Sequence, residues 1–407
     1  MIGIIYAIFI AAIMVGNGIY FGPCTIRQYC AIILFIYLYF NWSNIKGFSQ
    51  IMPFYAMFIV LYGISALLEN NIQSFIRQLV ALYGVALLGY YNTILILKRY
   101  YTFNYFLNSF IVVGIINSIV TILQYLGIKY GYLIGAIFVD MNDEVKVAQL
   151  TRMMQGNHSN LMGIMGDIVY NGYYSMILPF FLLFRFRHLN WMVKYALLFL
   201  SLMSLFMVGE RSCFGITLIL LMYYLYIEFR NSLLFYFLCL FAFSGLFWLV
   251  SDIINSDIVQ SSRWIGGDSG VRENINKEIL PFIIEHFFLG GQKAFLRLTG
   301  FPPHNVIASG FIYSGILGGM CIVYILMKQV MIAYTLLKKH KNILITLAFM
   351  SYTLNGFFHN PAIVTGDAMV WIMWGMVYFS YKNHRKSIIK SNKCGSISFN
   401  LGHSTSI

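Results

Sequence analysis

The sequence predicts an all-α, polytopic integral membrane protein with about twelve transmembrane helices and both termini in the cytoplasm. Three observations predict this fold class. Of the 407 residues, 59% are hydrophobic and only 10% are charged, whereas soluble domains carry about 25% charged residues. Apolar stretches close to the ~20 residues needed to cross a bilayer recur along the whole chain. Finally, basic residues are more frequent on one side of the spans that these stretches define.

Each expected span is one hydrophobic run. Residues 1–20 lack the basic start and the small-residue cleavage site of a signal peptide, so we interpret them as the first span. The runs are 2–20, 28–41, 51–68, 78–97, 104–126, 168–184, 192–208, 212–228, 232–250, 304–327, 342–358 and 361–381.

The charges orient these spans. With the N-terminus in the cytoplasm, 16 of the 27 Lys and Arg residues fall inside and 11 fall outside. Of the 14 acidic residues, only Glu228 falls inside. A surplus of basic residues in short loops marks the cytoplasmic side. The net charge of +13 is therefore an orientation signal, together with an anionic-lipid contact at the tail sequence YKNHRKSIIK. It does not indicate nucleic-acid binding.

The predicted spans form one transmembrane domain, 1–381, followed by a basic cytoplasmic tail, 382–407. Two outer segments are long, about 127–167 and 251–303, whereas every inner connection is short. Any chemistry is therefore expected to face outward, and we expect the loop at 251–303, directly before the tenth span, to be catalytic. The six cysteines lie mostly within spans and have no close metal-type spacing, which indicates small apolar residues.

The second outer segment contains a predicted helix. Ser269 can cap it, and Pro281 should kink or shorten it. The sequence FFLGG then predicts a turn before Lys293. The apolar positions share one helical face through their spacing of three to four; they are Val271, Ile275, Ile279, Phe282 and Ile283.

His304 and Asn305 follow Pro302 and Pro303 at the mouth of the tenth span. Because the prolines cannot continue a helix backwards, both residues should occupy a helix N-terminus, which favours a nearby anion. A neutral imidazole there can accept a proton from a sugar hydroxyl. The alternative is an ordinary interfacial histidine. Within the span, we interpret Gly315 and Gly319 as a small-residue pair for close helix packing.

Arg211 and Glu210 lie in the short outer turn between the seventh and eighth spans, so both should sit at membrane depth. Charges at that depth are costly and often functional. A guanidinium facing a cavity can bind a phosphate in bidentate fashion. The alternatives are a mutual Glu210–Arg211 interaction or a side chain that snorkels to the interface.

The remaining candidates are also on the outer side. Arg272 stands at the start of the loop helix, where it is either a substrate-binding cation or a solvated surface charge. Asp367 should lie a few residues inside the membrane, where it either lines a cavity or bonds to a neighbouring helix. The substrate-binding candidates are Asn305, Glu210, Arg263, Lys293, Arg297, His359 and Asp367. His158 and Asp167 flank the first outer segment and cannot be ranked.

These residues resemble the bacterial O-antigen polymerase and O-antigen ligase family of polytopic glycosyltransferases. His304-Asn305 followed by Gly315 and Gly318 is similar to the family's His-Asn…Gly-x-x-Gly pattern, after a large outer loop. Arg211 followed by a small residue, and Arg272 in SGVRENINKEIL, match the family's outer arginines. The specific resemblance covers roughly residues 190–330.

The resemblance implies a GT-C-like glycosyltransferase of the bacterial inner membrane whose active site faces the periplasm, in lipopolysaccharide or surface-polysaccharide biosynthesis. The expected substrate is an oligosaccharide on undecaprenyl pyrophosphate, and no cofactor or metal is required. Arg211 and Arg272 would stabilise the pyrophosphate leaving group, and His304 would act as the base. Expected partners are membrane lipids and a chain-length regulator and flippase of the same pathway.

Two alternatives remain at this point. An O-antigen ligase uses the same donor and transfers the glycan to lipid A-core, and no residue identifies either acceptor. We favour the polymerase by analogy with polymerases of polysaccharide gene clusters. A transporter that flips lipid-linked sugars belongs to another class. It would need charged residues along a path through the spans, which are nearly free of charge, and the sequence has no internal repeat.

Overall fold

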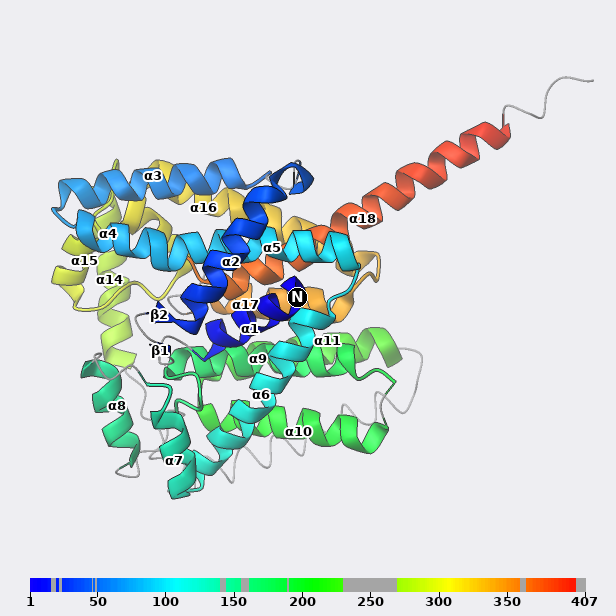
Figure 1. The fold of residues 1–407 in the computed structure, drawn as a ribbon. Helices are drawn as coiled ribbons and strands as arrows, with labels where there is room; N and C mark the ends of the chain where they lie inside the picture. Colours follow the sequence, from blue (N-terminus) through cyan, green and yellow to red (C-terminus); the bar gives the residue numbers. More distant parts are fainter. Residues whose placement is uncertain are drawn as a thin grey trace, which may run out of the picture.

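The computed structural model describes residues 1–15, 20–21, 24–45, 47, 50–139, 144–154, 161–188, 190–229, 269–358 and 364–399. Within these residues the chain is helical, apart from one pair of two-residue antiparallel strands, β1 (Tyr20–Phe21) and β2 (Cys24–Thr25) (Figure 1). The all-α class predicted from the sequence is thus confirmed.

The helices follow the predicted hydrophobic runs. Eleven of the twelve runs coincide with a helix, and the run at 232–250 lies outside the described residues. The elements are α1 (Ile2–Met14), α2 (Ile26–Phe40), the 3-10 helix η1 (Trp42–Ile45), α3 (Met52–Leu68), α4 (Ile72–Gln78), the π-helix η2 (Leu79–Gly84), α5 (Val85–Tyr100), α6 (Asn104–Tyr125), α7 (Lys129–Ala136), α8 (Glu144–Met154), α9 (Ile168–Arg185), α10 (Trp191–Val208), α11 (Arg211–Phe229), α14 (Ser269–Glu285), α15 (Gln292–Thr299), α16 (Val306–Lys338), α17 (Ile343–Asn355) and α18 (Ala368–Phe399).

Among the described residues, five helical segments are long and apolar enough to cross a membrane. They are Ile72–Tyr100, Asn104–Tyr125, Trp191–Val208, Arg211–Phe229 and Val306–Lys338. Shorter apolar helices are α1, α2, α3 and α17. The first of these ends at Met14, earlier than the predicted 2–20. These segments indicate a membrane-embedded, polytopic protein.

The interior of the bundle is built from helices far apart in sequence. α16 packs most extensively on α3, α18 on α5, and α9 on both α10 and α17. Trp371 and Trp374 of α18 are fully buried in the interior that these helices form. By contrast, α10 and α11 turn most of their apolar surface outward. An apolar exterior of this extent is expected where lipid is the solvent.

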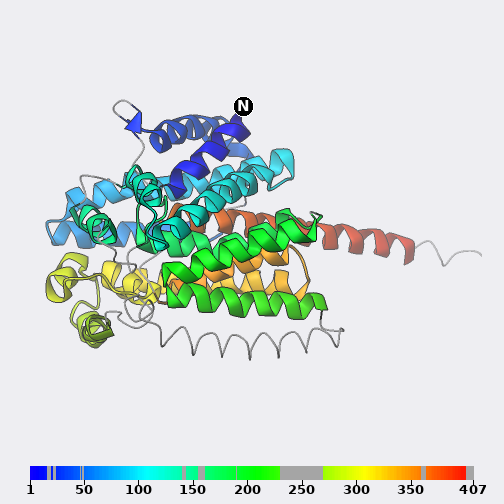
Figure 2. The ribbon, with the colours of Figure 1, turned by 90° about the horizontal axis from the view of Figure 1, so that it is seen from below.

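The described parts of the two long segments that were predicted to lie outside the membrane are at the same end of the bundle. Figures 1 and 2 show α7, α8, α14 and α15 at one end, which we call the loop end, and the extension of α18 at the other. The first segment, predicted as a loop at 127–167, contains α7 and α8. The tail predicted at 382–407 begins as a direct continuation of α18, which runs without a break to Phe399.

The loop helix predicted from Ser269 is α14. It begins at Ser269 and continues through Pro281 to Glu285, with Ile275 and Phe282 buried against the core. The predicted turn follows, and α15 begins at Gln292. Glu69, directly after α3, binds the start of α15: its carboxylate accepts from the backbone N–H groups of Lys293 (2.9 Å) and Ala294 (2.7 Å). A carboxylate at this position satisfies orphan donors of a helix N-terminus.

α16 is broken at Gly315, whose backbone is non-helical (φ 66°, ψ −166°). The turn after α14 fills the break. Ile316 N donates to Phe287 O (2.8 Å), and Gly291 N donates to Ile312 O (2.7 Å). These two bonds replace the helical bond that Ile316 would have made to Ile312. Our interpretation of Gly315 as a helix-packing residue was therefore wrong, because a helical spacing of small residues does not reveal a local break.

We expect Gly315→Ala to destabilise the fold. A Cβ at this position would overlap the Phe288 carbonyl, and the backbone conformation is one that L-residues rarely adopt. The cost should be about 1–3 kcal/mol in free energy of unfolding. Gly215→Ala is the matched control, since a Cβ on Gly215 of α11 meets nothing within 4 Å. Thermal unfolding of the purified protein in detergent measures both; equal unfolding temperatures would contradict this account of the break.

Candidate functional site

His304 and Asn305 lie at the start of α16, as predicted. Asn305 is the N-cap: its Oδ1 accepts hydrogen bonds from Ile307 N (2.9 Å) and Ala308 N (3.1 Å). His304, directly before the cap, is half-buried. The N-cap preference of asparagine explains why the helix begins at Val306 rather than earlier. His304 therefore occupies the N-terminal end of the α16 dipole.

The start of α16 is bound to the end of α17. Val306 N donates to Gly356 O (2.8 Å), and Asn305 Nδ2 donates to Phe357 O (3.3 Å). Directly before Gly356, Asn355 Nδ2 contacts Cys213 Sγ of α11 at 3.0 Å. This chain of contacts brings His304 and the start of α11 to the same end of the bundle.

Arg211 is the first residue of α11 and is exposed, whereas Glu210 directly before it is only 5% exposed. Glu210 packs against α9 so closely that a Cβ on Gly172 would lie 2.9 Å from its Cγ. Both residues thus lie at the junction between α10 and α11, as predicted, with Glu210 before the helix and Arg211 as its first residue. The burial of Glu210 and the exposure of Arg211 mean that only the arginine presents its charge to the surface.

Asp367 caps α18 and joins it to α17. Its Oδ1 accepts from Met369 N (2.8 Å), and its Oδ2 accepts from the Tyr352 hydroxyl (2.5 Å). The carboxylate is 6% exposed, and the Tyr352 ring contacts Tyr173 of α9 (centroids 4.7 Å apart). Of the two interpretations offered by the sequence, the structure confirms the hydrogen bond to a neighbouring helix.

The N-termini of α9, α11, α16 and α18 also lie at the loop end. Asp167 caps α9 through Val169 N (2.8 Å) and Tyr170 N (3.2 Å), so α9 and α18 both have carboxylate caps. α16 has a neutral cap, Asn305, and α11 begins with a cation, Arg211. Helix N-termini carry partial positive charge that attracts anions. The N-terminus of α16, with its neutral cap, accordingly favours an anion, whereas α11 begins directly after the buried side chain of Glu210.

The cations of the second outer segment are placed differently. Lys293 Nζ bonds to the carbonyls of Glu69 (3.3 Å) and Asn70 (3.4 Å), beyond the C-terminus of α3. Arg297 is exposed near the end of α15. Arg272 lies in the first turn of α14. A substrate contact for these three residues stays a prediction, and Lys293 would have to leave its carbonyl partners to make one.

Two sequence-predicted candidates, Arg263 and His359, lie outside the described residues, as does His158. Within the described part of the chain, no three His, Cys, Asp or Glu side chains form a cluster that could hold a metal ion.

Sequence reasoning missed Arg27, Tyr352 and Asn355. Arg27, in the first turn of α2, is half-buried and lies within electrostatic range of Tyr170 and Tyr174, which in turn interact with Asp367. A basic residue at the outer end of a span was an available signal, of the same kind as Arg211. Tyr352 and Asn355 carried no such signal, because their polar contacts are made to distant helices.

No protein-family model matches the chain, and a search of curated proteins finds no similar sequence.

Removing the Asn305 cap should loosen the start of α16. Asn305→Ala leaves Ile307 N and Ala308 N without their acceptor, at a cost of about 1 kcal/mol in free energy of unfolding. Asn305→Ser is the matched control, because its hydroxyl can still cap the helix although the bond to Phe357 O is lost. Thermal unfolding in detergent should rank wild type above Ser and Ser above Ala. An alanine variant as stable as the wild type would show that the cap contributes nothing.

Proposed function

We propose that the chain is a surface-polysaccharide polymerase that joins undecaprenyl-pyrophosphate-linked oligosaccharide repeat units on the outer side of the cytoplasmic membrane. The observation that supports this proposal best is the placement of His304 and Arg211 at the same end of the bundle. It combines a potential base, a cation and the N-terminus of α16, which has a neutral cap. That is the set of groups needed to deprotonate a hydroxyl beside an anionic leaving group.

In the proposed reaction, His304 accepts the proton of a sugar hydroxyl on the acceptor repeat unit. The hydroxyl oxygen attacks the anomeric carbon of the donor, and the bond from that carbon to the pyrophosphate oxygen breaks. Arg211, with Arg272 from α14, stabilises the charge that develops on the departing undecaprenyl pyrophosphate. Because the pyrophosphate linkage supplies the driving force, the reaction requires no nucleotide sugar.

The polyprenyl tail would lie along the apolar exterior of the bundle. α10 and α11 bury only 22% of their most apolar windows, against 61% for α16. α10 ends, and α11 begins, at the turn beside Arg211. A pyrophosphate bound at Arg211 would thus allow its hydrocarbon chain to stay in contact with lipid.

The proposal also includes the topology. The loop end, which contains α7, α8, α14 and α15, would be periplasmic. The opposite end, with the α18 extension, would be cytoplasmic. Twelve spans with both termini inside account for this arrangement and for the distribution of Lys and Arg residues.

The topology predicts the compartment of reporter fusions. Fusions after Lys46, Arg99, Arg187 and Lys339 should report cytoplasm, because these basic residues remain on the inner side. Fusions within 140–160 and 255–300 should report the outside. A cytoplasmic signal from 255–300 would place the proposed site in the wrong compartment and exclude the proposed reaction.

The function itself is tested by complementing a deletion strain and separating its lipopolysaccharide or capsule on a gel. A strain lacking a polymerase keeps one repeat on the core and loses the ladder. Loss of every repeat from the core would instead identify a ligase, which uses the same donor.

In this assay His304→Gln and His304→Ala should both fail to restore the ladder. Glutamine keeps some hydrogen bonding but cannot accept the proton, and loss of a general base costs roughly 10²–10⁴ in rate. His188→Gln is the matched control, since His188 is an exposed histidine in the turn after α9, away from the loop end. Protein level and membrane insertion should not change. A normal ladder from His304→Gln would mean that His304 only orients the substrate.

A further inference from the structure

A polar cavity lies at the opposite end of the bundle from His304. Its volume is about 260 Å³, and its lining comes from the chain before α3, from α5, from the second half of α16 and from α18. Phe54 near the start of α3 contacts Tyr324 of α16 (centroids 4.1 Å apart), whereas Tyr62 near the end of α3 contacts Tyr313. The two helices are therefore antiparallel, and the cavity is at the level where α3 begins.

The cavity has one cation and no carboxylate in its lining. Lys328 is half-buried, and its Nζ lies 5.6 Å from the centroid of the Tyr324 ring. Among the residues that the structure describes, no carboxylate contacts this ammonium group. The segments 42–51, 324–341 and 371–385, which supply most of the lining, contain seven Lys or Arg and no Asp or Glu. This charge pattern favours an anionic ligand.

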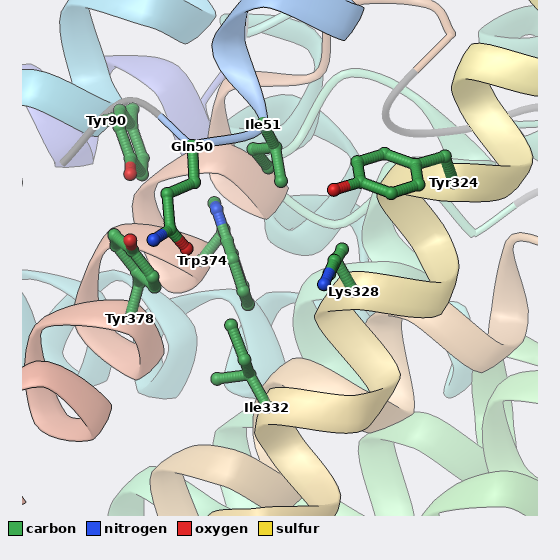
Figure 3. A pocket seen from close by; sticks show the side chains of 8 residues that line it. All are labelled: Gln50, Ile51, Tyr90, Tyr324, Lys328, Ile332, Trp374 and Tyr378. Atoms are coloured by element: carbon green, nitrogen blue, oxygen red, sulfur yellow. The ribbon is translucent and has the colours of Figure 1, made fainter. Parts of the chain in front are cut away.

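Trp374 adds a donor that lacks an acceptor. Its side chain is 1% exposed, and its ring nitrogen is buried in the cavity wall without a hydrogen-bond partner among the described residues. Figure 3 shows the indole in the middle of the lining, with Tyr90, Gln50 and Tyr378 on one side and Tyr324 and Lys328 on the other. A buried N–H group without an acceptor is costly, and an anionic oxygen would satisfy it.

The face of α16 beside the cavity suits hydrocarbon. Met327, Met331 and Tyr334 are exposed at helical spacing next to the two α16 residues, Lys328 and Ile332, that line the cavity. The volume is below the ~300–1,000 Å³ of pockets that enclose a whole small molecule. It fits a headgroup whose acyl chains remain outside. Tyrosine and tryptophan rings are also typical of the level at which lipid headgroups lie.

We propose that this cavity binds the phosphate of an anionic phospholipid, with Lys328 as the ion-pair partner and the Trp374 N–H as a hydrogen-bond donor. The acyl chains pack along Met327 and Met331. The site is separate from the proposed glycosyl-transfer site at the other end of the bundle, and it does not depend on that reaction.

The test uses the delipidated full-length protein in detergent, titrated with phosphatidylglycerol or phosphatidylcholine. Native mass spectrometry counts the bound lipid, and thermal unfolding measures the stabilisation. Phosphatidylglycerol should bind with saturation at one site and raise the unfolding temperature more than phosphatidylcholine. Lys328→Gln should weaken this binding about tenfold or more, since the charged partner of the phosphate is lost. Trp374→Phe keeps the ring, removes the donor and should weaken it less.

Lys194→Gln is the matched control. Lys194 is also half-buried beside a tyrosine, with its Nζ 5.1 Å from the Tyr195 ring centroid, but it is not part of the cavity lining. This variant should bind phosphatidylglycerol as the wild type does. An equal loss in both lysine variants would overturn the proposal in favour of general attraction to a basic surface. Equal stabilisation by inorganic phosphate alone would overturn it in favour of a free-phosphate site.

Discussion

The break in α16 at Gly315 is the constraint on which the loop end of the molecule depends. A helix interrupted inside an apolar bundle leaves an N–H and a C=O that water cannot reach, and each costs several kcal/mol if it stays unpaired. Here the turn after α14 supplies both partners through Phe287 O and Gly291 N. The turn can approach this closely only because Gly290 and Gly315 have no Cβ. The second outer segment is therefore built into the bundle rather than laid over it.

This insertion fixes the elements on either side of it. Before the turn, Phe282 holds α14 in the core. After the turn, the Glu69 carboxylate binds the start of α15, and Gln292, the first residue of α15, accepts a hydrogen bond from the Tyr62 hydroxyl. The chain then reaches the Asn305 cap with little freedom left. Backbone hydrogen bonds therefore hold the chain on both sides of His304. Before it, Gly291 N donates to Ile312 O at the break in α16, and after it, Val306 N donates to Gly356 O. Such placement suits a group that has to meet a substrate atom within hydrogen-bond distance.

Much of this arrangement could be predicted from local sequence. Long apolar runs identify helices because the bilayer sets their length, and Pro302 and Pro303 identify the start of α16 because proline cannot continue a helix backwards. The α14 face was predictable from its spacing, as was the position of Arg211 in its turn.

Other features could not be predicted, for physical reasons. Gly315 has the same spacing to Gly319 whether the helix is continuous or broken, so the sequence pattern does not distinguish the two cases. The bonds from Tyr352 to Asp367 and from Lys293 N to Glu69 join elements whose proximity is a property of the packed bundle. The bonds from Lys293 Nζ to the carbonyls of Glu69 and Asn70 could not be predicted either, because these partners are distant in sequence.

The two kinds of helix cap at the loop end also divide it by charge. Asp167 and Asp367 place carboxylates on α9 and α18, which offset the positive ends of those helices. Asp367 is held in place by the Tyr352 hydroxyl and by Met369 N. Under the proposed reaction, an anionic pyrophosphate would be attracted toward Arg211 and the uncharged cap of α16 rather than toward the two helices with acidic caps. Asp367 and Tyr352 are buried and bonded to each other, so they hold α17 and α18 together rather than meet a substrate. Under the proposed reaction, His304, directly before the uncharged cap of α16, would accept the proton of the acceptor hydroxyl, while Arg211 at the start of α11 would contact the pyrophosphate.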